Sequence, residues 1–188
     1  MSAPSEERTT PGIVIGRMPF SNTSLLVTWA TSDAGVMKTM AKGALGPKPS
    51  AGLTLDLFYL CEIRYRPSAR SEISALREAK LIEPFLSLRR DWITLLCAQY
   101  FADLLASLSE PHTEMVEIFA IFEKALRHLQ THAPTRKLVD RYETRLLELS
   151  GLPAESDRVG ALRHAVENHH HRVPPTRARL LEELAKPI

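Results

Sequence analysis

Cysteine is scarce in this chain, and its spacing argues against a cysteine-based metal site. The 188 residues contain only Cys61 and Cys97, which lie far apart and belong to no CxxC pair. A zinc site built on cysteine needs closely spaced thiolates, so we expect none here. Two isolated cysteines are typical of a reducing compartment, where they behave as small buried hydrophobic residues.

Long apolar runs are also missing. No segment approaches the roughly 18 apolar residues that a membrane-spanning helix needs. The first eleven residues, MSAPSEERTTP, contain no apolar signal region. We therefore expect no membrane association and no secretion, and we expect the protein in the cytoplasm.

The sequence lacks the short motifs of common enzyme classes. It contains no GxxxxGK[ST], GxGxxG, GxSxG or HExxH, and its carboxylates are scattered among basic residues. We expect no catalytic residue and no cofactor. His128 and His132 are one helical turn apart, but no acidic third ligand follows at a matching step, so we expect no metal site. A metal-dependent activity at this histidine pair is the enzyme alternative.

Charge is unevenly distributed along the chain. The net charge is +2, yet residues 11–82 carry nine Lys/Arg against five Asp/Glu, a local charge of +4. Residues 83–188 carry fourteen against fifteen, a local charge of −1. The basic excess of the first half points weakly to a partner that carries phosphate.

The first half has the pattern of short strands separated by turns. Residues 1–10 are polar, and we expect them to form a disordered tail. The loop sequences TSDAG and GALGPKPSAG mark turns between apolar runs that alternate with a period of two. The expected strands are 12–17, 24–30, 36–42, 53–66 and one or two within 72–82. Residues 11–83 are thus predicted to form a small barrel of five strands.

The segment LTLDLFYLCEIRYR, residues 53–66, is the longest of these runs. Its odd positions are uncharged and predict a buried face, whereas its even positions include Phe58, Arg64 and Arg66. Fourteen residues exceed the common strand length, so we expect a sharp bend. An aromatic ring beside cations suits the binding of single-stranded nucleic acid, because bases stack on the ring and phosphates pair with the cations. An ordinary solvent-exposed face is the alternative.

The second half changes period. After Pro84, apolar residues recur at intervals of three and four, and Pro134 and Gly151 punctuate the pattern. Residues 84–188 are predicted to form a bundle of four or five helices. The aromatic residues of these helices are expected to be core residues. They are Trp92, Tyr100, Phe101, Phe119 and Phe122.

Several stretches in order resemble the RecO family of bacterial recombination mediators. RMPFSNTS, from Arg17 to Ser24, is similar to the family segment R-x-P-[YF]-S-E-x-S. MAKGALGPKPS, residues 40–50, is similar to its V-A-K-G-A-R-R-P-K-S. FADLLASLSEPHTEMVEIFAIFEKAL and RYETRLLELSGLP resemble two segments of its helical half. The resemblance covers residues 12–153 in the family's order.

The resemblance implies an α+β protein, with an N-terminal five-stranded OB-fold barrel followed by an all-α helical domain. It also implies a nucleoid-associated, non-enzymatic protein of recombinational repair. Such a protein binds single- and double-stranded DNA, anneals strands, and acts with a RecR-like protein and a single-strand-binding protein. The resemblance assigns phosphate contacts to Arg17, Lys42 and Lys48. The strand pattern adds the cations Lys38, Arg64, Arg66 and Arg70 and the stacking candidates Phe20 and Phe58.

The chain departs from the family pattern at several positions. Leu45 and Gly46 replace the two loop arginines, and Asn22 replaces a glutamate. The cysteine zinc cluster that many family members carry is missing, and the segment after Gly151 finds no clear counterpart. Loss of loop charge predicts weaker DNA binding. The alternative function is therefore a protein-interaction scaffold with a RecO-like fold.

Overall fold

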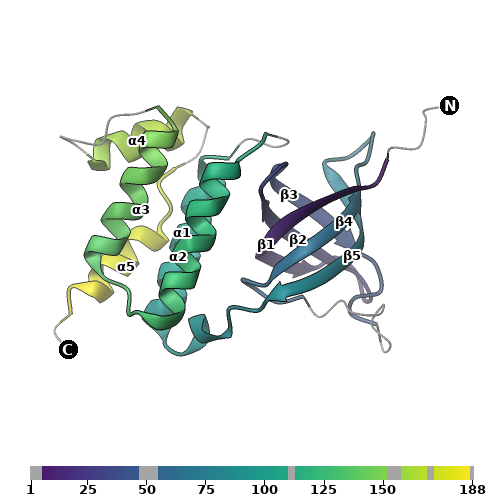
Figure 1. Cartoon of the computed structure of the whole chain (residues 1–188), viewed down its shortest axis with the longest axis horizontal. Helices are drawn as coiled ribbons and strands as arrows, with labels where there is room; N and C mark the ends of the chain where they lie inside the picture. The colour runs from purple at the N-terminus through teal and green to yellow at the C-terminus, as the bar shows by residue number, and fades with distance from the viewer. Residues whose placement is uncertain (1–5, 47–54, 110–112, 152–157, 169–171, 187–188) are drawn as a thin grey trace. The chain divides into compact units, whose positions relative to one another are not determined.

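The computed structural model describes residues 6–46, 55–109, 113–151, 158–168 and 172–186 (Figure 1). The chain divides into two compact units, and the boundary between them falls after Pro84. Among the described residues, every strand belongs to the first unit and every helix to the second. No helix in the described part of the chain is long and apolar enough to cross a membrane.

The first unit is a closed barrel in which the strands follow the order β1-β2-β3-β5-β4. The pair β3–β5 is parallel, and all the other neighbouring strands are antiparallel. The predicted OB-fold barrel is therefore confirmed. The strands are β1 Arg8–Pro19, β2 Leu25–Thr31, β3 Gly35–Ala41, β4 Leu60–Arg66 and β5 Ile73–Glu83.

Strand alternation places the barrel core as the sequence predicts. Leu25, Val27 and Trp29 of β2 are all buried, and Trp29 is fully enclosed. The indole nitrogen of Trp29 donates a hydrogen bond to Oγ1 of Thr39 at 2.8 Å, so its one polar atom is satisfied inside the core. The opposite face of β3 carries Lys38 into solvent.

The predicted strand over residues 53–66 is wrong in its first half. Residues 53–54 lie outside the described part, and β4 begins only at Leu60. Asp56 accepts a hydrogen bond from the backbone N–H of Leu57 at 2.8 Å and starts a turn. Phe58 then adopts a φ of 62° and buries its ring completely. A turn therefore takes the place of the expected bend.

The predicted tail is also too long. β1 begins at Arg8, and residues 8–13 pair with β4 before residues 12–19 pair with β2. An irregularity between Val14 and Gly16 marks the change of partner. A closed barrel needs β1 to pair on both sides, which explains why the polar residues 8–10 form a strand. Residues 1–5 lie outside the described part.

In its described residues, the second unit contains a short 3-10 helix and five α-helices. Asp91 caps α1 by accepting from the N–H of Thr94 at 2.7 Å, and Thr135 caps α3 in the same way at 3.2 Å. Gly151 follows α3 with a φ of 74°, as the helix-stop pattern predicts. The helices are η1 Leu86–Arg89, α1 Trp92–Ser107, α2 Val116–Thr131, α3 Arg136–Leu149, α4 Arg158–Asn168 and α5 Thr176–Leu184.

One aromatic prediction in the helices is wrong. Trp92 stands at the first position of α1, is 49% exposed, and lies under the guanidinium of Arg179 at 4.6 Å. A residue at the start of a helix has no preceding turn to pack against, so the ring of Trp92 stays half exposed and pairs with the cation of Arg179. The other four aromatic residues are buried as predicted.

Candidate nucleic-acid interface

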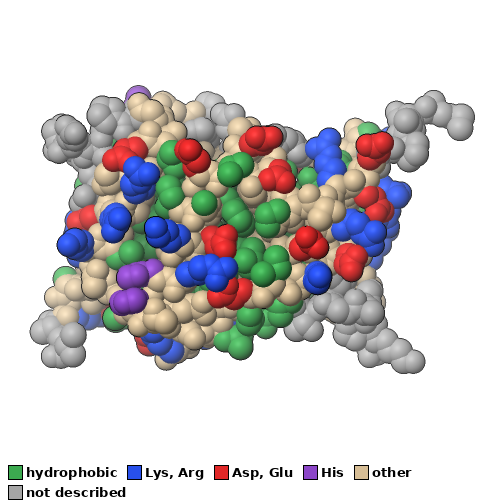
Figure 2. Space-filling view, viewed as in Figure 1, with side chains coloured by type: hydrophobic (Ala, Val, Ile, Leu, Met, Phe, Trp, Pro, Cys, Tyr) green, Lys and Arg blue, Asp and Glu red, His purple; other side chains and the backbone are tan. Residues whose placement is uncertain are grey.

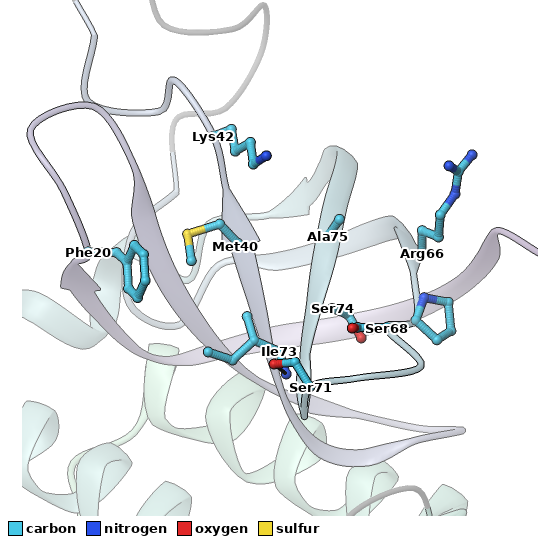
Figure 3. A pocket seen from close by; sticks show the side chains of 10 residues that line it. Phe20, Met40, Lys42, Arg66, Ser68, Ser71, Ile73, Ser74 and Ala75 are labelled. Atoms are coloured by element: carbon cyan, nitrogen blue, oxygen red, sulfur yellow. Dashed lines mark hydrogen bonds between the residues drawn. The ribbon is translucent and has the colours of Figure 1, made fainter. Parts of the chain in front are cut away.

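A pocket of about 480 Å³ opens on the barrel surface (Figure 3). The loop between β1 and β2, strands β3 and β5, and the loop between β4 and β5 all contribute to its wall. In OB-folds, the loops β1–β2 and β4–β5 flank the face that binds oligonucleotides. The lining residues are Phe20, Met40, Lys42, Arg66, Pro67, Ser68, Ser71, Ile73, Ser74 and Ala75.

The β1–β2 loop keeps Phe20 exposed to solvent. Oγ of Ser21 accepts from the backbone N–H of Ser24 at 3.1 Å, and the N–H of Phe20 donates to the carbonyl of Ser24 at 2.9 Å. These bonds close a tight turn of the kind that Ser and Asn favour. The ring of Phe20 is 59% exposed as a result, which leaves a face on which a base can stack.

The β4–β5 loop supplies hydroxyl groups. Oγ of Ser68 accepts from the N–H of Arg70 at 3.2 Å, and Oγ of Ser71 accepts from the N–H of Ile73 at 3.0 Å. Both serines therefore order the loop through their lone pairs and keep a hydroxyl hydrogen that can be donated. Hydroxyl donors are common partners of phosphate oxygens.

The floor of the pocket is apolar, with an aromatic ring at one end and a cation at the other. Met40, Ile73 and Ala75 lie between Phe20 at one end and Arg66 at the other (Figure 3). Alternation along β3 puts Met40 on the same face as the exposed side chain of Lys38. An aromatic ring, an apolar floor and flanking cations are the parts that a single-stranded nucleic acid needs.

The cations predicted from the sequence lie mainly on two strands that flank β5 in the barrel. Lys38 lies on β3, Lys42 directly after it, and Arg64 and Arg66 on β4. Arg70 is exposed in the β4–β5 loop, and the order β3-β5-β4 places the single strand β5 between the cations of β3 and those of β4. Acidic side chains are interspersed with basic ones over the barrel face that Figure 2 shows.

Three predicted site residues require separate comment. Arg17 lies on β1, where it forms an ion pair with Asp56 at 3.0 Å and donates to the carbonyl of Leu55 at 3.0 Å. It therefore supports the turn before β4, and its phosphate contact stays a prediction. Lys48 lies outside the described residues. Phe58 is wrong as a stacking surface because its ring is fully buried.

Sequence reasoning missed part of the pocket. Met40, Ser68 and Ser71 carry no motif, and only the pairing of Met40 with Ala75 across β3 and β5 brings them near Phe20. The alternation of β3 already placed Met40 beside Lys38 and Lys42 on one face. That alternation was the one available signal for the floor of the pocket.

The histidines and cysteines offer no metal centre in the described residues. The rings of His128 and His132 stack in parallel with centroids 4.1 Å apart. Partial burial lowers the pKa of His128, and the neighbouring side chains of His132 and Arg141 lower it further. Burial raises the pKa of Cys61 to about 11, and it raises that of Cys97 still further, so both thiols stay protonated.

Comparison with known families agrees with this architecture. Residues 3–85 match the family model described as "Recombination protein O N terminal". Residues 89–170 match the model described as "Recombination protein O C terminal". The first match contains the whole barrel, and the second contains α1 to α4. The expectation that the segment after Gly151 has no counterpart in the family is therefore wrong as far as residue 170.

Curated relatives give the same result. The chain is 25% identical over 146 residues to DNA repair protein RecO of Anaeromyxobacter sp. (strain K), which covers 78% of this chain and 58% of that protein. It is 29% identical over 139 residues to the Rhodopirellula baltica protein of that name, covering 74% and 52%. It is 30% identical over 137 residues to the protein of that name from Xanthomonas oryzae pv. oryzae (strain PXO99A), which covers 73% of this chain and 56% of that protein. The chain thus spans little more than half the length of these relatives. Since the two family models together match residues 3–85 and 89–170, the chain belongs to the recombination protein O (RecO) family.

Proposed function

We propose that this protein binds and anneals single-stranded DNA in recombinational repair, as a non-enzymatic factor. The observation that carries the proposal is the barrel pocket, where the exposed ring of Phe20 and the side chains of Lys42 and Arg66 surround an apolar floor. Stacking on an aromatic ring tolerates any base, whereas cations follow the backbone. The names of the relatives, DNA repair protein RecO, support the same role.

The binding step is tested by a salt titration with a labelled oligothymidine of about twelve nucleotides, a length within the reach of one OB-fold. Neutralising about four phosphates of a single strand gives a log–log slope near −3. We expect Lys42→Gln to weaken binding and to reduce this slope by about 0.7. Lys80→Gln is the matched control, because Lys80 is an exposed barrel residue that does not line the pocket.

The stacking role of Phe20 gives a second readout. We expect Phe20→Ala to weaken binding by about 1–3 kcal/mol while the salt slope stays unchanged, because stacking releases no counterions. Phe20→Tyr keeps a stacking face and serves as the control. Unmeasurable binding of the unaltered protein at low salt would contradict the proposed function, and so would a Phe20→Ala protein that binds normally.

Annealing and partner binding extend the proposal. The family resemblance supports strand annealing and an action together with a RecR-like protein and a single-strand-binding protein. We expect the protein to accelerate pairing of complementary strands coated with single-strand-binding protein, and Lys42→Gln to slow this reaction. Pairing at the spontaneous rate in the presence of the protein would contradict an annealing role.

A protein-interaction scaffold is the second candidate function. Three of the arginines predicted to bind DNA already pair with carboxylates: Arg17 with Asp56, Arg64 with Glu78 and Arg66 with Glu7. Leu45, at a position where the family has arginine, is 43% exposed. Binding of a purified RecR-like protein that survives nuclease treatment, together with no binding of oligothymidine, would favour the scaffold over the DNA-binding role.

A further inference from the structure

Three arginines on the outer face of β4 and β5 converge on one carboxylate. Oε1 of Glu7 lies 3.2 Å from Nη2 of Arg66 and 3.4 Å from Nε of Arg77. Its other oxygen lies 3.8 Å from Nη1 of Arg64. Glu7 thus occupies the centre of a cluster that presents guanidinium groups from two strands.

The pairing of the strands explains how the cluster forms. Thr9 of β1 stands opposite Arg64 of β4, so Glu7, two residues earlier, falls on the same face beside Arg66. On β5, Glu78 stands opposite Arg64, but Leu76 stands opposite Tyr65. Arg77 is therefore the extra residue of a β-bulge.

The bulge decides where Arg77 points. Strict alternation would turn either Arg77 or Glu78 into the barrel, yet both are exposed while Leu76 and Ala79 are buried. Bulges commonly redirect a side chain in this way. The extra residue brings a third guanidinium group within reach of Glu7.

The cluster has more positive charge and more donors than Glu7 and Glu78 can satisfy. Arg64 also pairs with Glu78 at 2.9 Å, which leaves three arginines against two carboxylates. Nε of Arg66 is buried and has no acceptor among the described residues. A phosphate offers more oxygens than a carboxylate, and guanidinium groups bind it with paired donors.

We propose that Arg64, Arg66 and Arg77 form a binding site for a backbone phosphate of nucleic acid, and that Glu7 occupies this site as an intramolecular competitor until the phosphate displaces it. The inference rests on the proposed function, because Arg66 also lines the barrel pocket and links the two sites.

Displacement of Glu7 requires little rearrangement. Glu7 precedes the first residue of β1, and the β1–β4 ladder begins with Arg8 opposite Tyr65. Its side chain is 32% exposed, and those of the arginines are 41–51% exposed. Ion pairs this open to water contribute little to stability, so the carboxylate can swing out without breaking the strand.

The role of Glu7 as a competitor is tested by measuring the affinity of the Glu7→Gln protein for the oligothymidine described above. We expect Glu7→Gln to bind about threefold to fivefold more tightly at low salt, because it removes a negative charge next to the incoming phosphate. Asp33→Asn is the matched control, since it changes the net charge equally at an exposed turn of the same barrel. Equal affinities of the two variants would overturn the inference.

A second variant tests the role of Arg77, the third arginine of the cluster. In the Glu7→Gln background, we expect Arg77→Gln to cancel the gain in affinity and to lower the salt slope by about 0.7, the share of one phosphate contact. Arg89→Gln, in the helical unit, is the control for loss of one positive charge. An Arg77→Gln change that leaves both affinity and slope unaltered would remove Arg77 from the site.

A titration with inorganic phosphate separates this inference from the proposed function. We expect phosphate to shift the Nε–H resonances of Arg66 and Arg77 more strongly in Glu7→Gln than in the unaltered protein. Shifts without DNA binding by any variant would leave a site for free phosphate and overturn the nucleic-acid assignment of both proposals. DNA binding without such shifts, and without a difference between Glu7→Gln and Asp33→Asn, would overturn the inference alone.

Discussion

At the scale of single residues, the helical unit depends on one buried carboxylate. Glu143 is completely buried and accepts from the hydroxyl of Tyr100 at 2.6 Å and from Nε of Arg177 at 2.7 Å. These bonds join α1, α3 and α5. Burial together with the neighbouring Glu143 charge raises the pKa of Tyr100, so its hydroxyl remains a donor. A buried charge is tolerated only when it is paired in this way.

Removing Arg177 should destabilise the helical unit strongly. We expect Arg177→Met to cost about 3 kcal/mol, because it leaves a buried negative charge without its cation. Urea unfolding followed by far-ultraviolet circular dichroism measures the loss. The control is Arg136→Met, which breaks an exposed pair with Asp140 and should cost under about 0.5 kcal/mol. Equal losses in both variants would contradict a role for the buried pair.

The two cysteines give a pH-dependent prediction. With its pKa raised to about 11, Cys61 forms about a hundredfold less thiolate at pH 8 than an ordinary thiol does, and Cys97 forms still less. We expect neither to react with a thiol reagent at pH 8 in the folded protein, and both to react in urea. The rate for Cys61 should rise as the pH approaches 11. Rapid labelling at pH 8 would contradict the burial of both side chains.

At the scale of elements, β1 is the strand that closes the barrel, and Gly12 is its tightest point. Gly12 pairs with Thr31 of β2 and with Cys61 of β4. A Cβ at Gly12 would stand 3.3 Å from the ring of Trp29 and from Cγ2 of Thr31. At Gly16 the nearest atom, Cβ of Thr28, is 3.4 Å away. The absence of a side chain at Gly12 therefore lets three strands approach closely.

Gly12→Ala should consequently loosen the barrel. We expect it to lower the free energy of unfolding by about 1 kcal/mol through overpacking, and Gly16→Ala to change it by less than about 0.5 kcal/mol. Fluorescence of the buried Trp29, measured in a Trp92→Phe background, reports on the barrel. A Gly12→Ala protein as stable as the Gly16→Ala protein would contradict this prediction. It would show that Trp29 and Thr31 can move to accommodate the added methyl group without a loss of stability.

Elements also show how far the sequence could predict the structure. Alternation grouped Trp29 with Leu25 and Val27 on one face, which the structure buries, because a period of two is a local property. It failed at Phe58, where a turn changes the side-chain direction, and it gave no placement for Arg77, which a bulge redirects. The turn depends on Asp56 and on burial of an aromatic ring, and the bulge depends on the register with β4. Both are set by tertiary contacts that a single strand does not reveal.

At the scale of the whole molecule, function is assigned to the barrel. The barrel contains the pocket, the arginine cluster around Glu7 and most of the predicted cations. The helical unit contributes a buried polar network and, in its described part, no group of metal ligands. Family membership covers both units, so the proposal that DNA binds to the barrel has to be tested on the full chain.

Hydrogen exchange of the full chain with and without saturating oligothymidine tests this account most directly. We expect DNA to slow exchange at backbone amides of the β1–β2 loop, residues 20–24, and of the segment 66–75, and to leave α3 unchanged. The expected protection follows from the position of Phe20, Arg66 and Ser71 around the pocket. Protection confined to the helices, or no protection under conditions where the oligonucleotide is bound, would contradict the assignment of DNA binding to the barrel.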